Sequence, residues 1–200
     1  MRGDDETGRA QRLRQQLAPH IALTPADAER MSQYSRDRRY ARGALLHHGG
    51  VRCTKLLFIV EGVVRSFEAG EITDKALRLI GPPDPAVSYS SLITGAPAIE
   101  TLQAITPVSG IELDFLAYAQ ENPSLLTQQL RAILAEGHFL AMERRVRMLQ
   151  IPRAEDRYRF FLEQMSAAIV AQTPAQIVAA YIGITPESLS RVKRALVKQG

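Results

Sequence analysis

The sequence has 200 residues, 46% of them hydrophobic, and a formal net charge of +4 at pH 7. This length and composition allow one large core or two smaller ones, which argues against an intrinsically disordered chain. No run of eighteen apolar residues occurs, the opening MRGDDETGRAQRLRQQ is too charged for the core of a signal peptide, and Cys53 is the single cysteine, so a cytoplasmic protein is predicted.

The basic excess lies at one end of the chain. Residues 141–200 carry ten Lys and Arg against five Asp and Glu, whereas residues 1–140 carry fifteen against sixteen. A basic end attracts phosphates without regard to base sequence. A solvated charged face would have the same composition.

Two short helices are expected before the first strand. Residues 9–21 place Leu13, Leu17 and Ile21 on one face, and Thr24-Pro25 opens a second helix that runs to about Ser32. Neither helix carries visible chemistry. Residues 1–23 are therefore interpreted as an N-terminal segment.

From Arg38 to Asp114, short apolar runs alternate with Gly, Pro and Asp, as in KLLFIVEG, ALRLIG and AVSYSSLITG. Such a texture predicts short antiparallel strands in a β-sandwich or barrel. The arginines around Arg36 and Arg42 are interpreted as the solvated side of the first strand. His47-His48 lacks the further ligands of a metal site, and Cys53 has no neighbouring cysteine, so no metal, cofactor or catalytic group is predicted.

Asp114 is a plausible N-cap for a short helix, FLAYAQEN, and Pro123 opens a long helix that reaches about Gln150. Heptad spacing along this helix predicts a seam between two subunits. The seam residues are Leu126, Leu130, Ile133, Gly137 and Leu140. A second apolar face, with Leu125, Leu134 and Met142, is available for packing on the chain's own β-domain, and both packings at once are favoured.

Ile151-Pro152 breaks the long helix and predicts a hinge. Residues 153–171 are expected to form one amphipathic helix with Tyr158, Phe161, Leu162 and Met165 inward. The chain beyond it, TPAQIVAAYIGITPESLSRVKRALVK, predicts two helices joined by a tight turn.

Each of these two helices has a start signal. Thr173, Pro174 and Gln176 form a potential capping box, and Thr185-Pro186-Glu187 repeats the device. Gly183 permits the left-handed exit of the first helix. With apolar residues on the facing sides, this is the pattern of a helix-turn-helix, although a helical hairpin in a core would also fit.

The outward residues of the second helix are the predicted DNA contacts. They are Thr185, Pro186, Glu187, Ser188, Ser190, Arg191 and Arg194. Arg191 could donate two hydrogen bonds to a guanine, and Glu187 could accept one from a cytosine amine.

The order of parts, together with ITPESLSRVKRAL, KLLFIVEGVVRSF, SYSSLITGAPA and ENPSLL, resembles the Crp/Fnr family of bacterial transcription regulators. The resemblance implies an α+β chain with an antiparallel β-roll of the cyclic-nucleotide-binding, jelly-roll type at 24–121, a dimerisation helix at 122–150 and a helix-turn-helix domain at 151–200. It implies a homodimer on a palindromic double-stranded operator, with RNA polymerase as a further partner. Base contacts would fall on Pro186, Glu187 and Arg191, and Pro186 departs from the arginine of the founding member.

The predicted sensor departs from the family pattern. The family's cassette joins a Gly-Glu pair to an Arg-Ser or Arg-Thr pair, and the arginine holds the cyclic phosphate. Val87–Thr101 contains no arginine, and Arg78 lies outside the matching segment. A cyclic nucleotide is therefore not assigned, and the candidate pocket residues are Ser88, Tyr89, Ser90, Ser91, Gly95, Leu140 and Ala141.

Three functions remain open from the sequence. The favoured one is a dimeric, non-enzymatic DNA-binding regulator with an altered or degenerate effector pocket. The alternatives are a cyclic-nucleotide-binding module acting on a protein partner and a cupin-like β-barrel enzyme, which would need a metal-ligand set that the sequence lacks.

Overall fold

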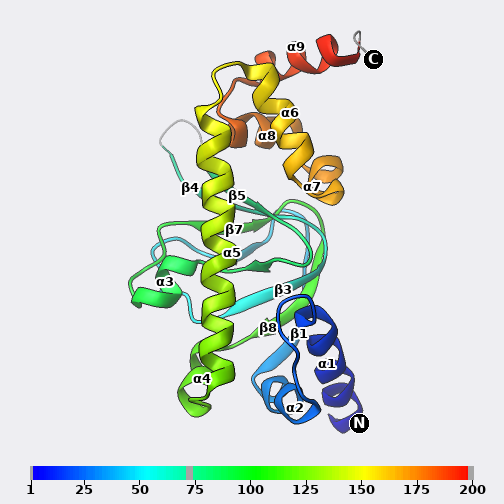
Figure 1. The fold of residues 1–200 in the computed structure, drawn as a ribbon, viewed down its shortest axis with the longest axis vertical. Helices are drawn as coiled ribbons and strands as arrows, with labels where there is room; N and C mark the ends of the chain where they lie inside the picture. Colours follow the sequence, from blue (N-terminus) through cyan, green and yellow to red (C-terminus); the bar gives the residue numbers. More distant parts are fainter. Residues whose placement is uncertain (1, 71–73, 198–200) are drawn as a thin grey trace.

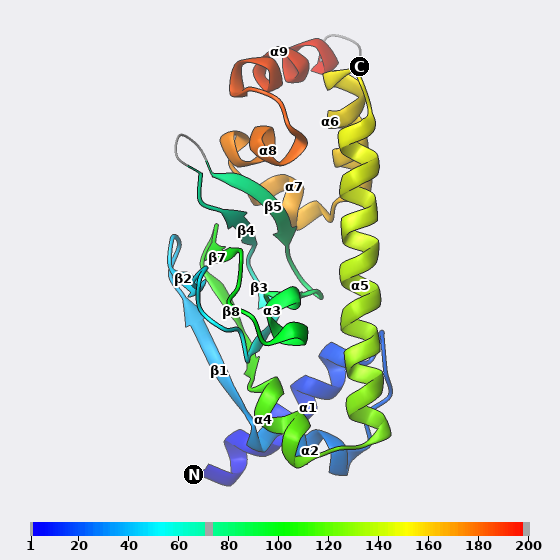
Figure 2. The same cartoon turned by 90° about the vertical axis from the view of Figure 1, so that its left-hand side faces the viewer.

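The computed structural model describes residues 2–70 and 74–197; the outermost ends of the predicted first and last segments, including Lys198, lie outside this range. Helix α5 (Leu125–Gln150) runs along the molecule and joins its two parts (Figure 1). At 26 residues, it is about 39 Å long. The β-roll lies on one side of α5, and the C-terminal helices pack around the far end of α5 (Figures 1 and 2).

The β-roll consists of two antiparallel sheets. The first has the order β1-β8-β3-β6 and the second has the order β2-β7-β4-β5. Their bounds are β1 Ser35–Tyr40, β2 Leu45–His47, β3 Leu56–Glu61, β4 Val64–Glu68, β5 Lys75–Ile80, β6 Pro85–Ala86, β7 Thr101–Ala104 and β8 Val108–Leu113. The predicted α+β class with an antiparallel roll is confirmed.

Side chains that alternate along the strands of the first sheet belong to two separate hydrophobic clusters. In β3, Leu57 and Ile59 pack between the sheets, whereas Leu56 and Phe58 face outward to the helices. In β8, Ile111 belongs to the outward cluster. The sheet therefore has a buried inner face and a second buried face that is covered by helices.

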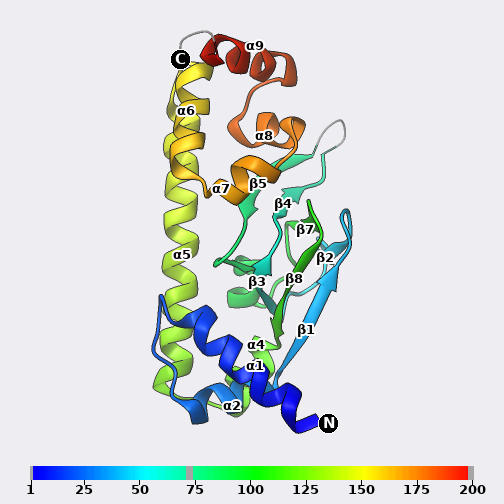
Figure 3. The same ribbon diagram turned by 90° about the vertical axis from the view of Figure 1, so that its right-hand side faces the viewer.

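Helices α1 (Arg2–Leu17) and α2 (Pro25–Gln33) cover that outer face (Figure 3). Leu13 and Leu17 are buried in the same cluster as Leu56. The predicted N-terminal segment thus shares the core of the roll. The predicted cap of α2 is confirmed, because the Thr24 hydroxyl accepts a hydrogen bond of 3.1 Å from the Asp27 N–H.

The predicted strand AVSYSSLITG is largely wrong, because its middle forms helix α3 (Tyr89–Thr94). Gly95 ends this helix in the left-handed region, with φ 73°. The Ser91 hydroxyl accepts a bond from the Cys53 N–H and donates one to the Ala96 carbonyl. Such local serine bonds compete with a strand ladder.

The predicted helix over 153–171 is also interrupted. It divides into α6 (Ala154–Gln164) and α7 (Ala167–Gln172) at Met165-Ser166, where Ser166 caps α7 by accepting a bond from the Ile169 N–H. By contrast, α4 (Phe115–Glu121) begins at Asp114 as expected. The hinge is extended at Ile151, as the following proline favours.

The last two helices are α8 (Ala175–Ile182) and α9 (Pro186–Val197). They form the predicted pair joined by a tight turn, at the end of the molecule away from α1 and α2 (Figure 2). Among the described helices, none has both the length and the apolar character needed to cross a membrane.

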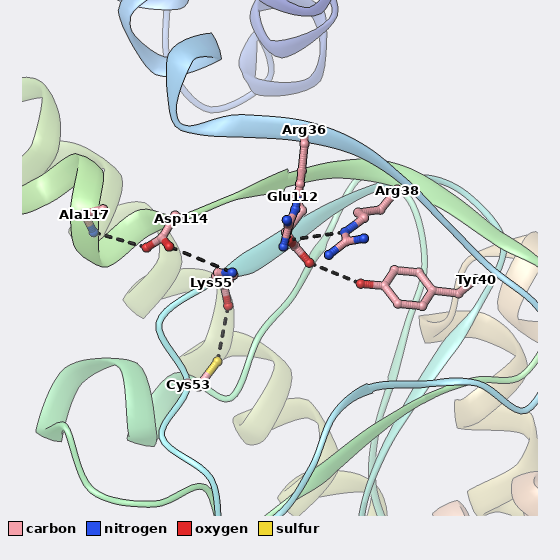
Figure 4. A network of polar contacts seen from close by, with 8 residues as sticks. All are labelled: Arg36, Arg38, Tyr40, Cys53, Lys55, Glu112, Asp114 and Ala117. Carbon is pink, nitrogen blue, oxygen red and sulfur yellow. Dashed lines mark hydrogen bonds and ion pairs between the residues drawn. The ribbon is translucent and has the colours of Figure 1, made fainter.

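A polar network secures β1 on β8 (Figure 4). The Glu112 carboxylate accepts hydrogen bonds from Arg36 at 2.6 Å and from the Tyr40 hydroxyl at 3.2 Å, and it pairs with Arg38. Burial raises the pKa of Glu112, but Arg36, Arg38 and Tyr40 together lower it below its usual value.

Glu112→Gln should therefore destabilise the roll at neutral pH. A carboxyl with a lowered folded-state pKa stabilises above its unfolded pKa, and this contribution is lost as the pH falls through the folded value. We expect a loss of about 1 kcal/mol in the free energy of unfolding at pH 7 that disappears towards pH 3, measured by urea unfolding. Glu68→Gln, at an exposed pair with Lys75, is the control and should change little; a loss at Glu112 that is independent of pH would contradict the account.

Candidate nucleic-acid interface and interdomain cavity

The turn between α8 and α9 is built by a glycine and an apolar underside. Gly183 has φ 70° and ψ 41°, and its N–H donates to the Ala179 carbonyl. Ala179, Ile182 and Leu189 are almost fully buried. The small side chain at position 179 lets the two helices approach closely, as the sequence predicted.

The two predicted start signals have different outcomes. Thr185 caps α9, because its hydroxyl accepts a hydrogen bond of 3.2 Å from the Ser188 N–H. Thr173 does not cap α8. It is the C-cap of α7, α8 is entered through Pro174, and the buried Thr173 hydroxyl has no hydrogen-bond partner within the described residues.

The predicted DNA contacts form the solvent-facing side of α9. Ser188 is half-buried, and the others are exposed: Thr185, Pro186, Glu187, Ser190, Arg191 and Arg194. Arg191 donates to the Ser188 hydroxyl at 3.1 Å, and Arg194 donates to the Ser190 carbonyl at 3.4 Å. Both guanidinium groups keep further N–H donors available to solvent.

Glu187 stays ionised at neutral pH. A hydrogen bond from its own backbone N–H, another from the Thr185 hydroxyl and the charge of Arg191 lower its pKa. The carboxylate can therefore act as a hydrogen-bond acceptor at the start of α9, where the helix dipole also favours negative charge.

Two arginines that the sequence did not single out hold the helix-turn-helix to the hinge. Arg157 of α6 donates to the carbonyls of Ile182 and Gly183 at 2.9 and 3.1 Å, and also to the Ile151 carbonyl. Arg145 of α5 donates to the Tyr181 carbonyl at 2.8 Å, and its guanidinium lies over the Tyr181 ring. The carbonyls at the C-terminal end of α8 thus receive positive partners.

The other side of the C-terminal domain packs on the roll. Leu79 of β5 lies in one buried cluster with Ile169, Val178 and Ile182. The approach is close, since a Cβ added at Gly81 would lie 3.2 Å from the Ile169 side chain. The helix-turn-helix and the roll are therefore joined by apolar contact as well as by α5.

The predicted pocket residues do not converge on one space. Of these residues, only Tyr89 and Ala141 line the cavity between the roll, α5 and the C-terminal domain. The remaining residues are dispersed. Ser88 is the buried N-cap of α3, Ser91 is buried within α3, and Gly95 ends it, whereas Ser90 and Leu140 are exposed.

That cavity has a volume of about 310 Å³ and lies outside the roll. Its walls come from the outer face of the first sheet, from α1, from α5 and from the C-terminal domain, which contributes Met165, Ile169 and Tyr181. A smaller cavity of about 180 Å³, lined in part by Tyr40 and Glu112, lies at the edge of the space between the sheets.

Arg78 was discounted from its position in the sequence, but the structure brings it to the larger cavity. Its guanidinium pairs with Glu100 at 2.9 Å and donates to the Val87 carbonyl at 2.5 Å. Glu100 also accepts a bond from the Ser66 hydroxyl. The segment Val87–Thr101 lacks arginine, yet β5 supplies a buried one.

The predicted subunit seam is wrong in part, because most of it faces the chain's own core. Leu130 is 3% exposed, and Leu126 packs against the same cluster. Ile133 and Gly137 line the interdomain cavity, and only Leu140 is an exposed apolar side chain. Leu126 and Leu130 instead pack on the chain's own β-domain. Their aliphatic side chains fill the cluster on the outer face of the first sheet.

Comparison with solved structures finds the same fold in proteins that include transcription regulators. FixK2 from Bradyrhizobium japonicum matches with a TM-score of 0.69 and 18% identity over 83% of this chain and 86% of that chain. The c-di-GMP-responsive global regulator CLP from Xanthomonas campestris gives 0.67 and 18% over 86% and 91%. TTHA1359 from Thermus thermophilus, a Crp/Fnr-family transcriptional regulator, gives 0.62 and 22% over 82% and 87%.

The chain has the fold of the Crp/Fnr transcription regulators. At these identities the likeness establishes the fold. No protein-family model and no curated protein sequence matches this chain. The Crp/Fnr fold accounts for the order of roll, long helix and helix-turn-helix that the sequence predicted.

Gly183→Ala should destabilise the C-terminal domain. The backbone is left-handed at Gly183, and a Cβ there would lie 3.2 Å from both Arg157 and Leu149. We expect a loss of about 1 kcal/mol in the free energy of unfolding.

Gly137→Ala is the matched control. Gly137 lies inside α5, and no atom lies within 4 Å of an added Cβ, so alanine should stabilise by up to about 1 kcal/mol. Urea unfolding of the two variants checks the pair, and equal effects would contradict the assigned turn geometry.

Proposed function

We propose that the protein is a sequence-specific DNA-binding transcription regulator that acts as a homodimer and has an altered effector pocket. The observation that carries the proposal is the exposed, capped N-terminal half of α9. Arg191 and Glu187 stand on its outer side, while Leu189 fixes its inner side in the domain core.

The two arginines of α9 have different tasks in this proposal. Arg191 lies one turn from the helix start and reads a guanine edge, since its planar fork can donate two bonds to O6 and N7. Arg194 lies further along the helix and contacts the phosphate backbone. Glu187 accepts a bond from a cytosine amine.

The homodimer is proposed to form through a second apolar face of α5, whose large side chains are mostly left uncovered by the roll. Four large apolar side chains on this face are exposed in the single chain, among them Leu125 at 70% and Phe139 at 67%. The face repeats every seven residues, as a coiled coil requires. Its members are Leu125, Gln128, Ala132, Ala135, Phe139, Met142, Val146 and Leu149.

The altered effector pocket is supported by the state of Arg78. A cyclic phosphate needs a free guanidinium, whereas this one already binds Glu100 and the Val87 carbonyl. The space between the sheets holds the side chains of Ile59, Val64 and Leu102. A cyclic nucleotide is therefore not expected to be the effector.

Selection of duplex sites from random DNA with the full chain tests the proposed function. Two α9 helices related by a two-fold axis should select symmetric sites whose halves lie about one helical turn apart. Affinity should fall steeply with salt. Recovery of only asymmetric or single-stranded sites would contradict the proposal.

Arg191→Ala should lower affinity for the selected site by about 1–3 kcal/mol and relax the preference at one base pair. Arg194→Ala should weaken selected and random DNA alike and flatten the salt dependence. Both are measured by fluorescence anisotropy at two salt concentrations. If both variants lose the same affinity on both kinds of DNA, the assigned roles are wrong.

Phe139→Glu should dissociate the dimer, because it places two carboxylates at the centre of an apolar seam. Operator affinity should fall with it. Gln129→Glu is the control, since it adds the same charge to an exposed flank of α5. Sedimentation measures the mass of both variants, and a Phe139→Glu protein that stays dimeric would exclude this seam.

A further inference from the structure

The cavity of about 310 Å³ is built from both functional parts of the chain. Leu56 and Phe58 of β3 form its floor, and α5 forms one wall. Ile169 and Tyr181 reach it from the C-terminal domain. A molecule in this space would touch the roll and the helix-turn-helix domain at once.

Most of the lining is apolar. Phe58, Phe115, Ile133, Leu134 and Ile169 are among the residues that line it. A volume of about 310 Å³ lies at the lower end of the range for small-molecule sites, about 300–1,000 Å³, which are mostly hydrophobic with a few placed polar groups.

Two unsatisfied polar atoms belong to residues that line this cavity. Arg78 is about nine-tenths buried, and its Nε has no hydrogen-bond partner among the described residues. The buried Nδ1 of His138 on α5 likewise has none within the described part of the chain. The His138 ring stacks on Tyr89, with centroids 5.2 Å apart, so its orientation is held.

Buried polar atoms in folded proteins are nearly always paired. Burial lowers the pKa of His138, and the charge of Arg78 lowers it further, although Glu100 opposes this. A neutral imidazole can present either N–H or a lone pair at Nδ1, whereas Nε of Arg78 can only donate. The two atoms therefore suit a ligand with an oxygen acceptor.

The charges disfavour an anion at this end of the cavity. Arg78 is already neutralised by Glu100 at 2.9 Å. Asp84 and Arg144 also line the space, and their opposite charges offset each other. A buried anionic group beside Arg78 would lie close to the Glu100 carboxylate, and a buried like-charge contact is costly.

We propose that this cavity is a binding site for an uncharged, largely apolar small molecule that carries one carbonyl-type oxygen, which accepts a hydrogen bond from Arg78. The apolar body lies between β3, α5 and α7. Because the ligand touches both domains, it stabilises the docking of the C-terminal domain on the roll. Its effect on DNA affinity rests on the function proposed above, whereas its binding does not.

Three naphthalenes that share one ring system test the ligand class on the full chain. The probe 2-acetylnaphthalene has the neutral acceptor, 2-ethylnaphthalene lacks it, and 2-naphthoate replaces it with an anion. Titration calorimetry should show 2-acetylnaphthalene binding about tenfold more tightly than either of the others, which corresponds to one hydrogen bond to a charged donor. Hydrogen exchange should show new protection in α7 and α8.

Gly137→Leu tests the location. Gly137 lines the cavity, and no atom lies within 4 Å of an added Cβ, so the side chain of a leucine would start in open space. Binding of 2-acetylnaphthalene should fall at least tenfold. Gln129→Leu adds the same side chain to an exposed part of α5 and should bind as the unmodified chain does.

His138→Phe tests the polar end while keeping the ring that stacks on Tyr89. It should reduce the preference for the acetyl over the ethyl compound and leave the unfolding temperature nearly unchanged. Arg78 itself is not substituted, because its loss would leave Glu100 buried without its cation.

The outcomes separate cleanly. Equal binding of the ethyl compound would overturn the role of the acceptor, and tighter binding of naphthoate would overturn the uncharged class. Absence of binding, or binding unchanged in Gly137→Leu, would overturn the site. If 2-acetylnaphthalene changes operator affinity in the unmodified chain but not in Gly137→Leu, the cavity also has a regulatory role. If the chain selects no DNA, the proposed function fails, and calorimetry still shows whether the cavity binds the probe.

Discussion

The arrangement of this protein depends on one apolar cluster that crosses from the roll to the C-terminal domain. Leu79 of β5 and Val63 stand on one side, and Ile169, Val178 and Ile182 stand on the other. Each fully buried aliphatic side chain contributes about 1.5–3 kcal/mol. Without this contact, the C-terminal domain would be attached only through the extended hinge at Ile151 and through α5.

Polar contacts then fix the orientation that the apolar cluster allows. Arg157 connects the hinge carbonyl of Ile151 with the carbonyls that end α8, and Arg145 holds Tyr181 from α5. Hydrogen bonds have a preferred geometry, whereas apolar burial has none. The direction in which α9 presents Arg191 is therefore set by arginines on the buried side of the domain.

Local signals in the sequence were sufficient for much of the fold. Thr24, Asp114 and Thr185 cap helices where expected, and Gly183 takes the left-handed turn. Such features depend on a few neighbouring residues. The order of roll, long helix and helix-turn-helix was also predictable, because short apolar runs separated by turn residues give way to segments with helical periodicity.

Contacts between residues that are distant in the sequence could not be predicted from such local signals. Position along the chain did not show that Arg78 of β5 would meet Glu100, because the two are brought together only when the second sheet forms. Helix α5 carries apolar residues on two faces at heptad spacing, and the packing of the roll decided which one is buried. Thr173 shows the same limit, since the end of α7 places it where a cap for α8 was expected.

We infer that the roll and the C-terminal domain form one cooperative unit through their shared apolar cluster. Native-state hydrogen exchange on the full chain tests it directly, because it gives the opening free energy of each segment. The account predicts that the buried amides of α8, at Val178 and Ile182, open with the same free energy as those of β5 at Leu79. Exchange of α8 through a separate opening of much lower free energy, with β5 still protected, would contradict it.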